Sequence, residues 1–236
     1  MDKFEKRLSV LGRAPSTCMS YTRQLAKIAL HFDCLPTELD EDQITDYLHY
    51  LQQEHNTPSE SYFKHAVYSL RMLCKVEGIK QSEIGLPSIK KSKRLPTVLS
   101  KSEMWALIQA PDLLKHKILL GLLYGCGLRC REARSVRLQD LDYDRMKLHV
   151  VQGKGKKDRY VPLSEHLVRG LRKYIEAENP DIWLFNGQPQ DNRKDGDFDS
   201  RYSQKGVQWA VKSALKKTGI IKDVTTHTLR HTFATH

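Results

Sequence analysis

Apolar residues recur every three or four positions in three stretches of the first 80 residues, at 17–32, 40–51 and 58–77. This spacing predicts three helices, each with one apolar face. Local signals mark the limits of the third helix, because Pro58 stands at a first helical position and Gly78 follows the last apolar turn. The N-terminal third of the chain is therefore predicted to be a small helical domain.

The pattern from Ser100 onward begins with helices. Ser100 and Glu103 have capping-box spacing and open a second domain. The run at 112–124 is apolar enough for a buried helix, and helical periodicity returns at 164–177 and 204–217. These helices supply most of the predicted second core.

Strand patterns lie between those helices. Residues 146–152 and 159–163 flank a turn rich in Gly and Lys, which predicts a β-hairpin. Residues 182–185 form a short apolar segment that is expected to be buried. The polar stretch at 187–200 is expected to be a mobile loop.

Together these elements predict a mainly α protein of two domains. The first, residues 1–85, is a helical bundle. Residues 86–99 are a linker, and residues 100–236 form a mixed α/β domain with a small antiparallel sheet.

Charge separates the two halves of the chain. The formal net charge is +11, but residues 1–85 hold 10 basic and 12 acidic residues, whereas residues 86–236 hold 29 and 16. The second half is therefore expected to bind a polyanion such as nucleic acid. The linker adds a basic cluster between two prolines, made of Lys90, Lys91, Lys93 and Arg94. It is either an extended strap along phosphates or a plain solvated connection.

The rest of the composition argues against membrane and secreted proteins. No apolar run approaches the roughly 20 residues of a membrane span, and the first ten residues lack the apolar core of a signal peptide. The five cysteines form no CxxC pair, which fits a reduced cytoplasm.

Two short stretches carry the candidate chemistry. In GLRCREA, Arg129 and Glu132 have a spacing that places both on one face of a helix, and His227 and Arg230 repeat it in HTLR. Between them the hairpin turn brings a basic cluster of Lys154, Lys156, Lys157 and Arg159. Arginine forks and lysine point charges suit an oxyanion such as a phosphate diester, although one arginine alone more often forms a surface ion pair.

In this order and spacing, the motifs resemble those of the tyrosine recombinase (phage integrase) family. The resemblance implies that Arg129, Lys154, His227 and Arg230 are catalytic, and that Glu132 orients Arg129 from behind. Lys154 would protonate the leaving 5′ oxygen, and His227 would donate to a phosphate oxygen or handle the proton of the nucleophile. The basic linker residues, Lys156, Lys157 and Arg159 would contact DNA.

The same resemblance implies the wider setting. Residues 1–85 would be a core-binding domain of SAM-like fold, and the partners would be a double-stranded DNA target site and further copies in a synaptic tetramer. A bacterial, cytoplasmic enzyme without cofactor is expected. His227 and His231 are four residues apart, as in some zinc sites, but no acidic residue has the matching spacing, so no metal is expected.

One departure from the family pattern changes the expectation for activity. In the family a second His or Trp and then a nucleophilic Tyr follow the H-x-x-R helix, whereas this sequence stops at His236 and none of its ten tyrosines follows Arg230. The sequence is therefore expected to be a recombinase fragment that binds DNA without cleaving it. Two other classes stay open: a non-catalytic DNA-binding regulator, and an enzyme like the type IB topoisomerases.

Overall fold

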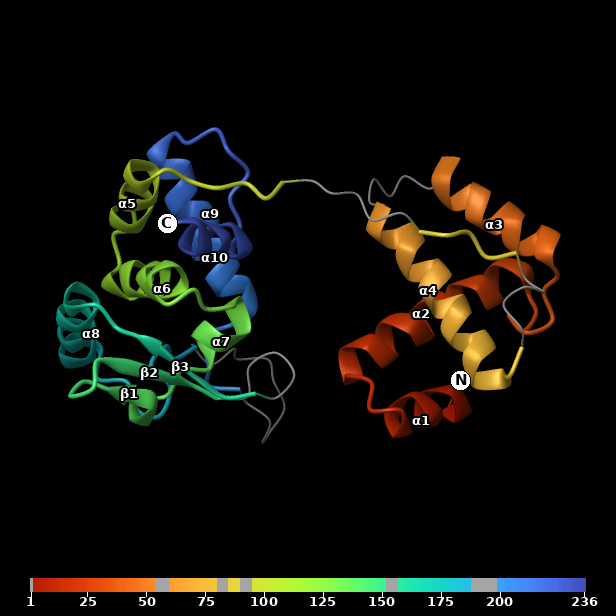
Figure 1. Cartoon of the computed structure of the whole chain (residues 1–236), viewed down its shortest axis with the longest axis horizontal. Coiled ribbons are helices and arrows are strands. Elements are labelled where there is room, and N and C mark those ends of the chain that lie inside the picture. The colour runs from red at the N-terminus through yellow and green to blue at the C-terminus, as the bar shows by residue number, and fades with distance from the viewer. Residues whose placement is uncertain (1, 54–59, 80–84, 90–94, 152–156, 188–198) are drawn as a thin grey trace. The chain divides into compact units, whose positions relative to one another are not determined.

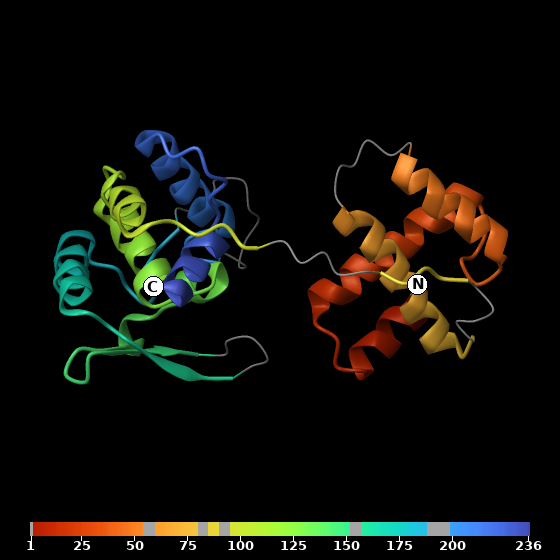
Figure 2. The ribbon, with the colours of Figure 1, turned by 45° about the horizontal axis from the view of Figure 1, so that its top comes forward.

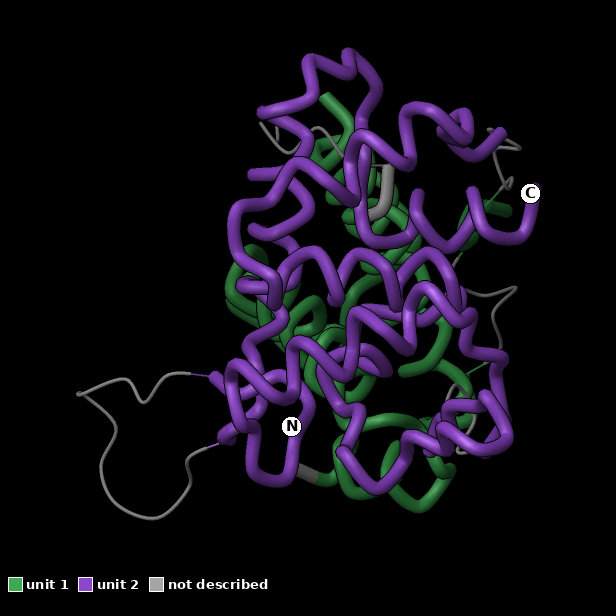
Figure 3. Tube along the Cα trace, turned by 90° about the vertical axis from the view of Figure 1, so that its left-hand side faces the viewer, with its two compact units in different colours: residues 1–93 green, residues 94–236 purple. Residues whose placement is uncertain are grey.

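The computed structural model describes residues 2–53, 60–79, 85–89, 95–151, 157–187 and 199–236. The chain divides into two compact units, Met1–Lys93 (unit 1) and Arg94–His236 (unit 2) (Figure 3). Each unit has its own hydrophobic core. The predicted mainly helical protein of two domains with a small antiparallel sheet is confirmed.

Unit 1 is built from helices alone: α1 (Asp2–Val10), α2 (Pro15–Phe32), α3 (Glu41–Gln53) and α4 (Glu60–Glu77) (Figure 1). The predicted capping box before α3 is present, because the Gln43 amide donates to Asp40 Oδ1 at 2.8 Å. The start signal predicted at Thr57 and Pro58 lies outside the described residues. The sequence pattern did not predict α1, because Phe4 and Leu8 are its two buried positions and two positions do not define a period.

Unit 2 combines seven helical segments with three strands in the part that the structure describes. They are α5 (Lys101–Gln109), α6 (Leu114–Gly125), α7 (Cys130–Arg134), the 3-10 turn η2 (Leu138–Asp140), β1 (Leu141–Asp142), β2 (Lys147–Val150), β3 (Arg159–Pro162), α8 (Glu165–Glu178), α9 (Gln204–Thr218) and α10 (Thr226–Thr235). The predicted capping box opens α5, since the Ser100 amide donates to Glu103 Oε2 at 2.7 Å.

The three strands form one antiparallel sheet in the order β1-β2-β3. In the predicted hairpin, Leu148 pairs with Val161 and His149 with Tyr160. Figure 2 shows this sheet at the bottom of unit 2, with the helices of the unit above it. The strand β1 was not predicted, because two residues carry no readable alternation.

Helix α6 forms the centre of the second core. Its buried residues face more than one direction, and it packs against α5, α8, α9 and α10. One expectation nearby needs correction: in the segment 182–185, Leu184 and Phe185 are fully buried, but Ile182 is 56% exposed. The buried part is half as long as predicted, because the Trp183 ring is only partly buried and lies against the guanidinium of Arg201.

Candidate functional site

The route from α6 to α7 fixes the backbone of Arg129. Helix α6 ends at Gly125, and Gly127 then takes a positive φ of 56°, which costs a glycine little. Leu128 is fully buried and anchors the turn. Arg129 follows with an extended backbone (φ −75°, ψ 155°), as the residue that precedes α7.

This geometry corrects the expectation that Arg129 and Glu132 share one face of a helix. Arg129 lies just before the helix, because the positive φ of Gly127 prevents α6 from continuing. The two residues meet all the same, since Glu132 folds back and accepts from the Arg129 amide at 2.8 Å and from its Nη1 at 2.7 Å. The carboxylate therefore fills an unpaired amide at the start of α7 as well as pairing with the guanidinium.

Glu132 lies at the centre of three guanidinium groups, which we call the arginine cluster: Arg129, Arg159 and Arg230. From β3, Arg159 donates to both carboxylate oxygens of Glu132, at 2.9 and 2.7 Å. From α10, Arg230 Nη1 lies 3.7 Å from Glu132 Oε2. The Glu132 side chain is 6% exposed, whereas the arginine side chains are 31–33% exposed. The carboxylate is hidden beneath a basic surface that solvent can reach.

The charges of the cluster do not balance. Burial alone would raise the pKa of Glu132, but hydrogen bonds from Arg159 and Arg129 lower that pKa to about 2. The pKa of Arg230 is lowered by its own burial and by the positive charge of Arg129. Three guanidinium groups against one carboxylate leave two positive charges over, and such a surplus at a partly buried site favours an anion.

Two long-range hydrogen bonds fix helix α10 and its Arg230 in place. Arg230 Nη1 donates to the Gly127 carbonyl, so the turn that shapes Arg129 also anchors the second arginine. Two residues on, the buried Thr232 accepts from the Leu99 amide at 3.1 Å. His227 lies one turn before Arg230 and is exposed, which leaves its ring free to meet a ligand.

A small pocket of about 220 Å³ opens beside the cluster. Arg159 and Arg230 form its basic side, and Gly127 lies against the ring of Phe233. The ring is so close that a Cβ built on Gly127 would lie 2.5 Å from Phe233 Cδ1. The pocket is lined by Cys126, Gly127, Arg159, Val161, Arg230, His231, Phe233 and Ala234.

The structure brings together four of the residues singled out from sequence: Arg129, Glu132, Arg159 and Arg230. Lys157 is exposed next to β3. The remaining candidates lie outside the described residues: Lys90, Lys91, Lys93, Arg94, Lys154 and Lys156.

Sequence reasoning placed Arg159 among the DNA contacts and missed its fork on Glu132. A signal for this was present in the strand pattern. Side chains alternate along β3, so Arg159 shares a face with Val161, which packs against the core. An arginine on the core face of a strand needs a buried acidic partner, and Glu132 is that partner.

The described residues contain neither a metal-ligating cluster nor a helix that could span a membrane. Within them, no three His, Cys, Asp or Glu side chains gather in a way that could hold a metal ion. No helix within those ranges is long and apolar enough to span a bilayer.

Comparison with known proteins places these residues in a family. A sequence model described as the phage integrase family matches residues 97–236. The inferred integrase/recombinase y4qK of Sinorhizobium fredii is 35% identical over 99% of this chain and 74% of its own length. Tyrosine recombinase XerA of Pyrococcus horikoshii is 30% identical over 100% of this chain and 78% of its own length.

Solved structures show the same fold. The crystal structure of XerA recombinase matches 99% of this chain and 81% of its own, with 25% identity and a TM-score of 0.52. A lambda integrase tetramer bound to a Holliday junction matches 99% of this chain and 67% of its own, with 18% identity and a TM-score of 0.75. With the family model covering unit 2 and relatives aligned along the whole sequence, this chain belongs to the phage integrase family.

Proposed function

We propose that this chain is part of a site-specific DNA recombinase, which breaks a DNA strand and rejoins it to another duplex. The observation that carries the proposal is the arginine cluster. Three guanidinium groups surround a carboxylate that is almost completely buried, and each presents about a third of its side chain to solvent. A phosphate diester is the ligand whose charge and oxygen geometry suit such a surface.

In this proposal Arg129 and Arg230 stabilise the reacting phosphate. When a hydroxyl attacks a phosphodiester, negative charge grows on the non-bridging oxygens, and fixed donors bind that charge more strongly in the transition state than in the ground state. Arg159 has both Nη atoms on Glu132. It therefore holds the carboxylate in place and adds positive charge, while Arg129 and Arg230 keep donors for the phosphate.

The remaining steps are assigned by residue type and family resemblance. A tyrosine oxygen attacks phosphorus, a 3′-phosphotyrosine bond forms, and the 5′ oxygen leaves with a proton supplied by Lys154. Rejoining is the reverse reaction with a new 5′ hydroxyl, so the bond energy is retained and neither metal nor ATP is required. His227 donates to a phosphate oxygen or handles the tyrosine proton.

The tyrosines of unit 2 have other contacts. Tyr124 Oη is hydrogen-bonded to His236 at 2.9 Å, and Tyr202 Oη to His116 at 3.0 Å. Tyr174 is buried against Phe185, Tyr160 stacks on His149, and the Tyr143 ring faces Arg172. We therefore propose that residues 1–236 bind the scissile phosphate without forming the covalent link.

We extend the proposal to the setting of the reaction. The basic linker (Lys90, Lys91, Lys93 and Arg94) follows the phosphate backbone, and residues 1–85 and 100–236 contact the duplex as two DNA-binding domains. Lys156 and Lys157 add contacts at the hairpin, where Arg159 contributes its charge while its Nη atoms stay on Glu132. The active form is a synaptic tetramer on double-stranded DNA, in the cytoplasm and associated with the nucleoid.

The test is a DNA substrate with a nick beside the cleavage point, which traps the covalent intermediate. The chain of residues 1–236 should bind this DNA and give no protein–DNA band on a denaturing gel. A chain extended by the codons downstream in its reading frame should give the band. In the extended protein, Arg129→Ala or Arg230→Ala should raise the activation free energy of cleavage by roughly 3–4 kcal/mol, as for the loss of one oxyanion donor. A covalent band from residues 1–236 would contradict the proposal and point to one of the ten tyrosines.

Two alternative functions give different outcomes in the same extended protein. A non-catalytic regulator would bind the nicked DNA and give no band at all. A type IB topoisomerase would give the band and relax supercoiled DNA without joining strands from two duplexes. Strand exchange between two labelled duplexes therefore separates the three classes.

A further inference from the structure

Helix α7 is too short to fix its own direction. It has five residues, Cys130–Arg134, and a helix of little more than one turn is not stable alone. Yet α7 carries Glu132, the carboxylate around which the arginine cluster gathers. The orientation of α7 therefore depends on its contacts with other elements of unit 2.

One of these contacts comes from Arg134, the last residue of α7. Arg134 lies two positions after Glu132, so the two side chains leave the helix in nearly opposite directions. The Arg134 side chain is 16% exposed and points to the segment that precedes α9. Its Nε donates to the Tyr202 carbonyl at 2.6 Å, and its Nη2 donates to Asp199 Oδ2 at 2.8 Å. One guanidinium thus joins α7 to a carbonyl and a carboxylate.

The Asp199 carboxylate is itself held on both oxygens. Arg201 Nε donates to Oδ1 at 2.6 Å, and Arg201 Nη2 donates to Oδ2 at 3.0 Å. Arg201 also returns to α7, because its Nη1 donates to the hydroxyl of Ser135 at 3.3 Å. The hydrogen bonds from Arg201 and Arg134 hold the pKa of Asp199 well below its usual range. The carboxylate is therefore charged at neutral pH.

The residues around Asp199 are anchored to the core. The Gly187 amide donates to the Ser200 carbonyl at 2.7 Å, and the Tyr202 amide donates to the carbonyl of the fully buried Phe185 at 2.8 Å. The two strands approach so closely that a Cβ built on Gly187 would lie 2.7 Å from the Arg201 carbonyl oxygen. Asp199 therefore offers α7 a fixed point of attachment.

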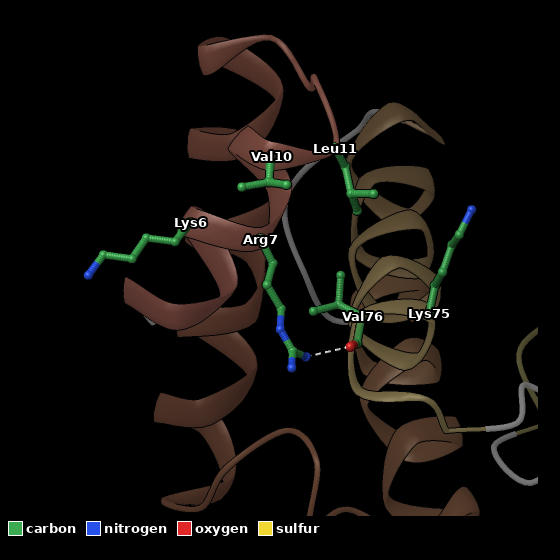
Figure 4. Close-up of a pocket in the computed structure, with 6 residues that line it drawn as sticks. All are labelled: Lys6, Arg7, Val10, Leu11, Lys75 and Val76. Carbon is green, nitrogen blue, oxygen red and sulfur yellow. Dashed lines mark hydrogen bonds between the residues drawn. The ribbon is translucent and has the colours of Figure 1, made fainter.

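Unit 1 uses the same kind of contact for another short helix. Helix α1 has nine residues, and its Arg7 donates to the Val76 carbonyl at 2.5 Å and to Glu77 Oε1 at 3.2 Å. Figure 4 shows the Arg7 side chain crossing from α1 to that carbonyl on α4. In both units, one arginine joins a short helix to its neighbour through a carbonyl and a carboxylate. In unit 2 the helix held in this way carries Glu132.

We propose that Asp199 is a positioning residue of the arginine cluster. It binds Arg134 and so holds α7 in the direction that keeps Glu132 against its arginines. Without the Asp199 carboxylate, the largely buried Arg134 guanidinium lacks an anion, and α7 should shift to bring that charge toward water. Glu132 would move with the helix and loosen its hold on Arg129.

The experiment follows the carboxyl carbon of Glu132 by NMR in the 236-residue chain, labelled with 13C at glutamate, from pH 6 down to pH 3. In the unmodified chain this carbon should keep the shift of a charged carboxylate, since the pKa of Glu132 is about 2. In Asp199→Asn and in Arg134→Lys, the pKa of Glu132 should rise by about 1 unit or more, because well-placed ion pairs lower a carboxyl pKa by about 1–3 units.

The direction of this change separates positioning from a simple effect of charge. Asp199→Asn removes a negative charge near Glu132, and this alone would lower the pKa of Glu132. Arg134→Lys keeps the charge, but an ammonium group cannot replace the rigid fork of donors. A higher pKa of Glu132 in both variants therefore reports a looser contact with its arginines.

Asp142→Asn is the matched control. Asp142 is 33% exposed, close to the 35% of Asp199, and it also pairs with an arginine, Arg145, at 3.2 Å. It lies in β1 and makes no hydrogen bond to α7 among the described residues. The pKa of Glu132 should therefore be unchanged in this variant.

The proposal is overturned if the pKa of Glu132 fails to rise in either variant that folds, or if it rises equally in the control. The amide spectrum of each variant shows whether it is folded. Should Asp199→Asn unfold the unit, Arg134→Lys decides, since it keeps both charges of the pair.

The consequence for catalysis rests on the proposed function and is measured separately. In the chain extended by its downstream codons, Asp199→Asn should slow cleavage of the nicked DNA about tenfold or more at saturating DNA, without weakening binding, because misplaced groups reduce the rate of the chemical step. Cleavage at the unmodified rate would refute this consequence and leave the proposed function intact. If the unmodified extended chain does not cleave, the proposed function fails, and the titration of Glu132 still decides whether Asp199 positions α7.

Discussion

The carboxylate of Glu132 offers a direct test of the arginine cluster, because Glu132→Gln removes one charge and leaves the shape almost unchanged. Glu132 is 6% exposed and accepts from Arg129 and Arg159. In the variant, three guanidinium groups face an amide, and no anion balances them. The folded state should therefore lose stability at neutral pH, even though the substitution adds no bulk.

The pKa of Glu132 sets the size of the effect. It falls from 4.5 to about 2 in the folded protein, and each unit of difference corresponds to 1.36 kcal/mol. The charged carboxylate therefore stabilises the fold by about 3 kcal/mol at pH 7. Because the folded pKa is the lower one, this contribution is complete above the unfolded value of 4.5 and is lost as the pH falls toward 2.

The assay is urea unfolding of the protein and its Glu132→Gln variant, followed by tryptophan fluorescence. All three tryptophans, Trp105, Trp183 and Trp209, lie in unit 2, so the signal reports on the unit that holds Glu132. The free energy of unfolding should differ by about 3 kcal/mol at pH 7. At pH 3 the difference should shrink to roughly 1.4 kcal/mol, because pH 3 lies only one unit above the folded pKa of about 2.

A matched control is Glu165→Gln. Glu165 is 86% exposed and lies 4.0 Å from Arg169, and an exposed pair of this kind contributes at most about 1 kcal/mol. The control should behave almost as the unmodified protein at both pH values. A difference for Glu132→Gln that stays constant between pH 7 and pH 3, or one below about 1 kcal/mol at pH 7, would refute the reasoning.

Three further outcomes are expected. DNA affinity should fall steeply with salt, and alanine at Lys90, Lys91, Lys93 and Arg94 should lower the slope of log affinity against log salt by as much as about 3.6, equally for all sequences; a loss confined to one sequence in filter-binding titrations would contradict the strap. Gly127→Ala should destabilise unit 2 by about 1–2 kcal/mol in urea, because it strains a positive φ and meets the Phe233 ring. Adding Phe233→Ala should relieve the contact and leave the backbone strain, so complete recovery in the double variant would show that φ is unimportant.

Local signals made the helices predictable. Ser100 and Glu103 form a capping box, and so do Asp40 and Gln43. Because the partners in each box are only three positions apart, the sequence alone predicts these hydrogen bonds. Helix α8 was predictable too, because it is amphipathic and its N-cap Ser164 follows directly after the hairpin. Elements with too few residues to show a period, α1 and β1, escaped detection.

The sequence singled out Arg129, Glu132, Arg159 and Arg230, but it did not predict how these four residues are arranged. The bonds from Arg159 to Glu132 cross 27 positions, and the bond from Arg230 to the Gly127 carbonyl crosses 103. Spacing along the chain carries no information about pairs so far apart. It therefore could not show that one buried carboxylate serves three arginines, or that a backbone carbonyl orients one of them.

The bond between the Leu99 amide and Thr232 has a consequence for the kinetics of folding. It joins positions 133 residues apart, so a long loop must close before this part of the core of unit 2 is complete. Loop closure of this length costs entropy that is recovered only afterwards, which slows folding. Unit 1 pairs its helices within residues 2–77. During synthesis, unit 1 is therefore expected to fold before α10, the last helix of unit 2, has been made.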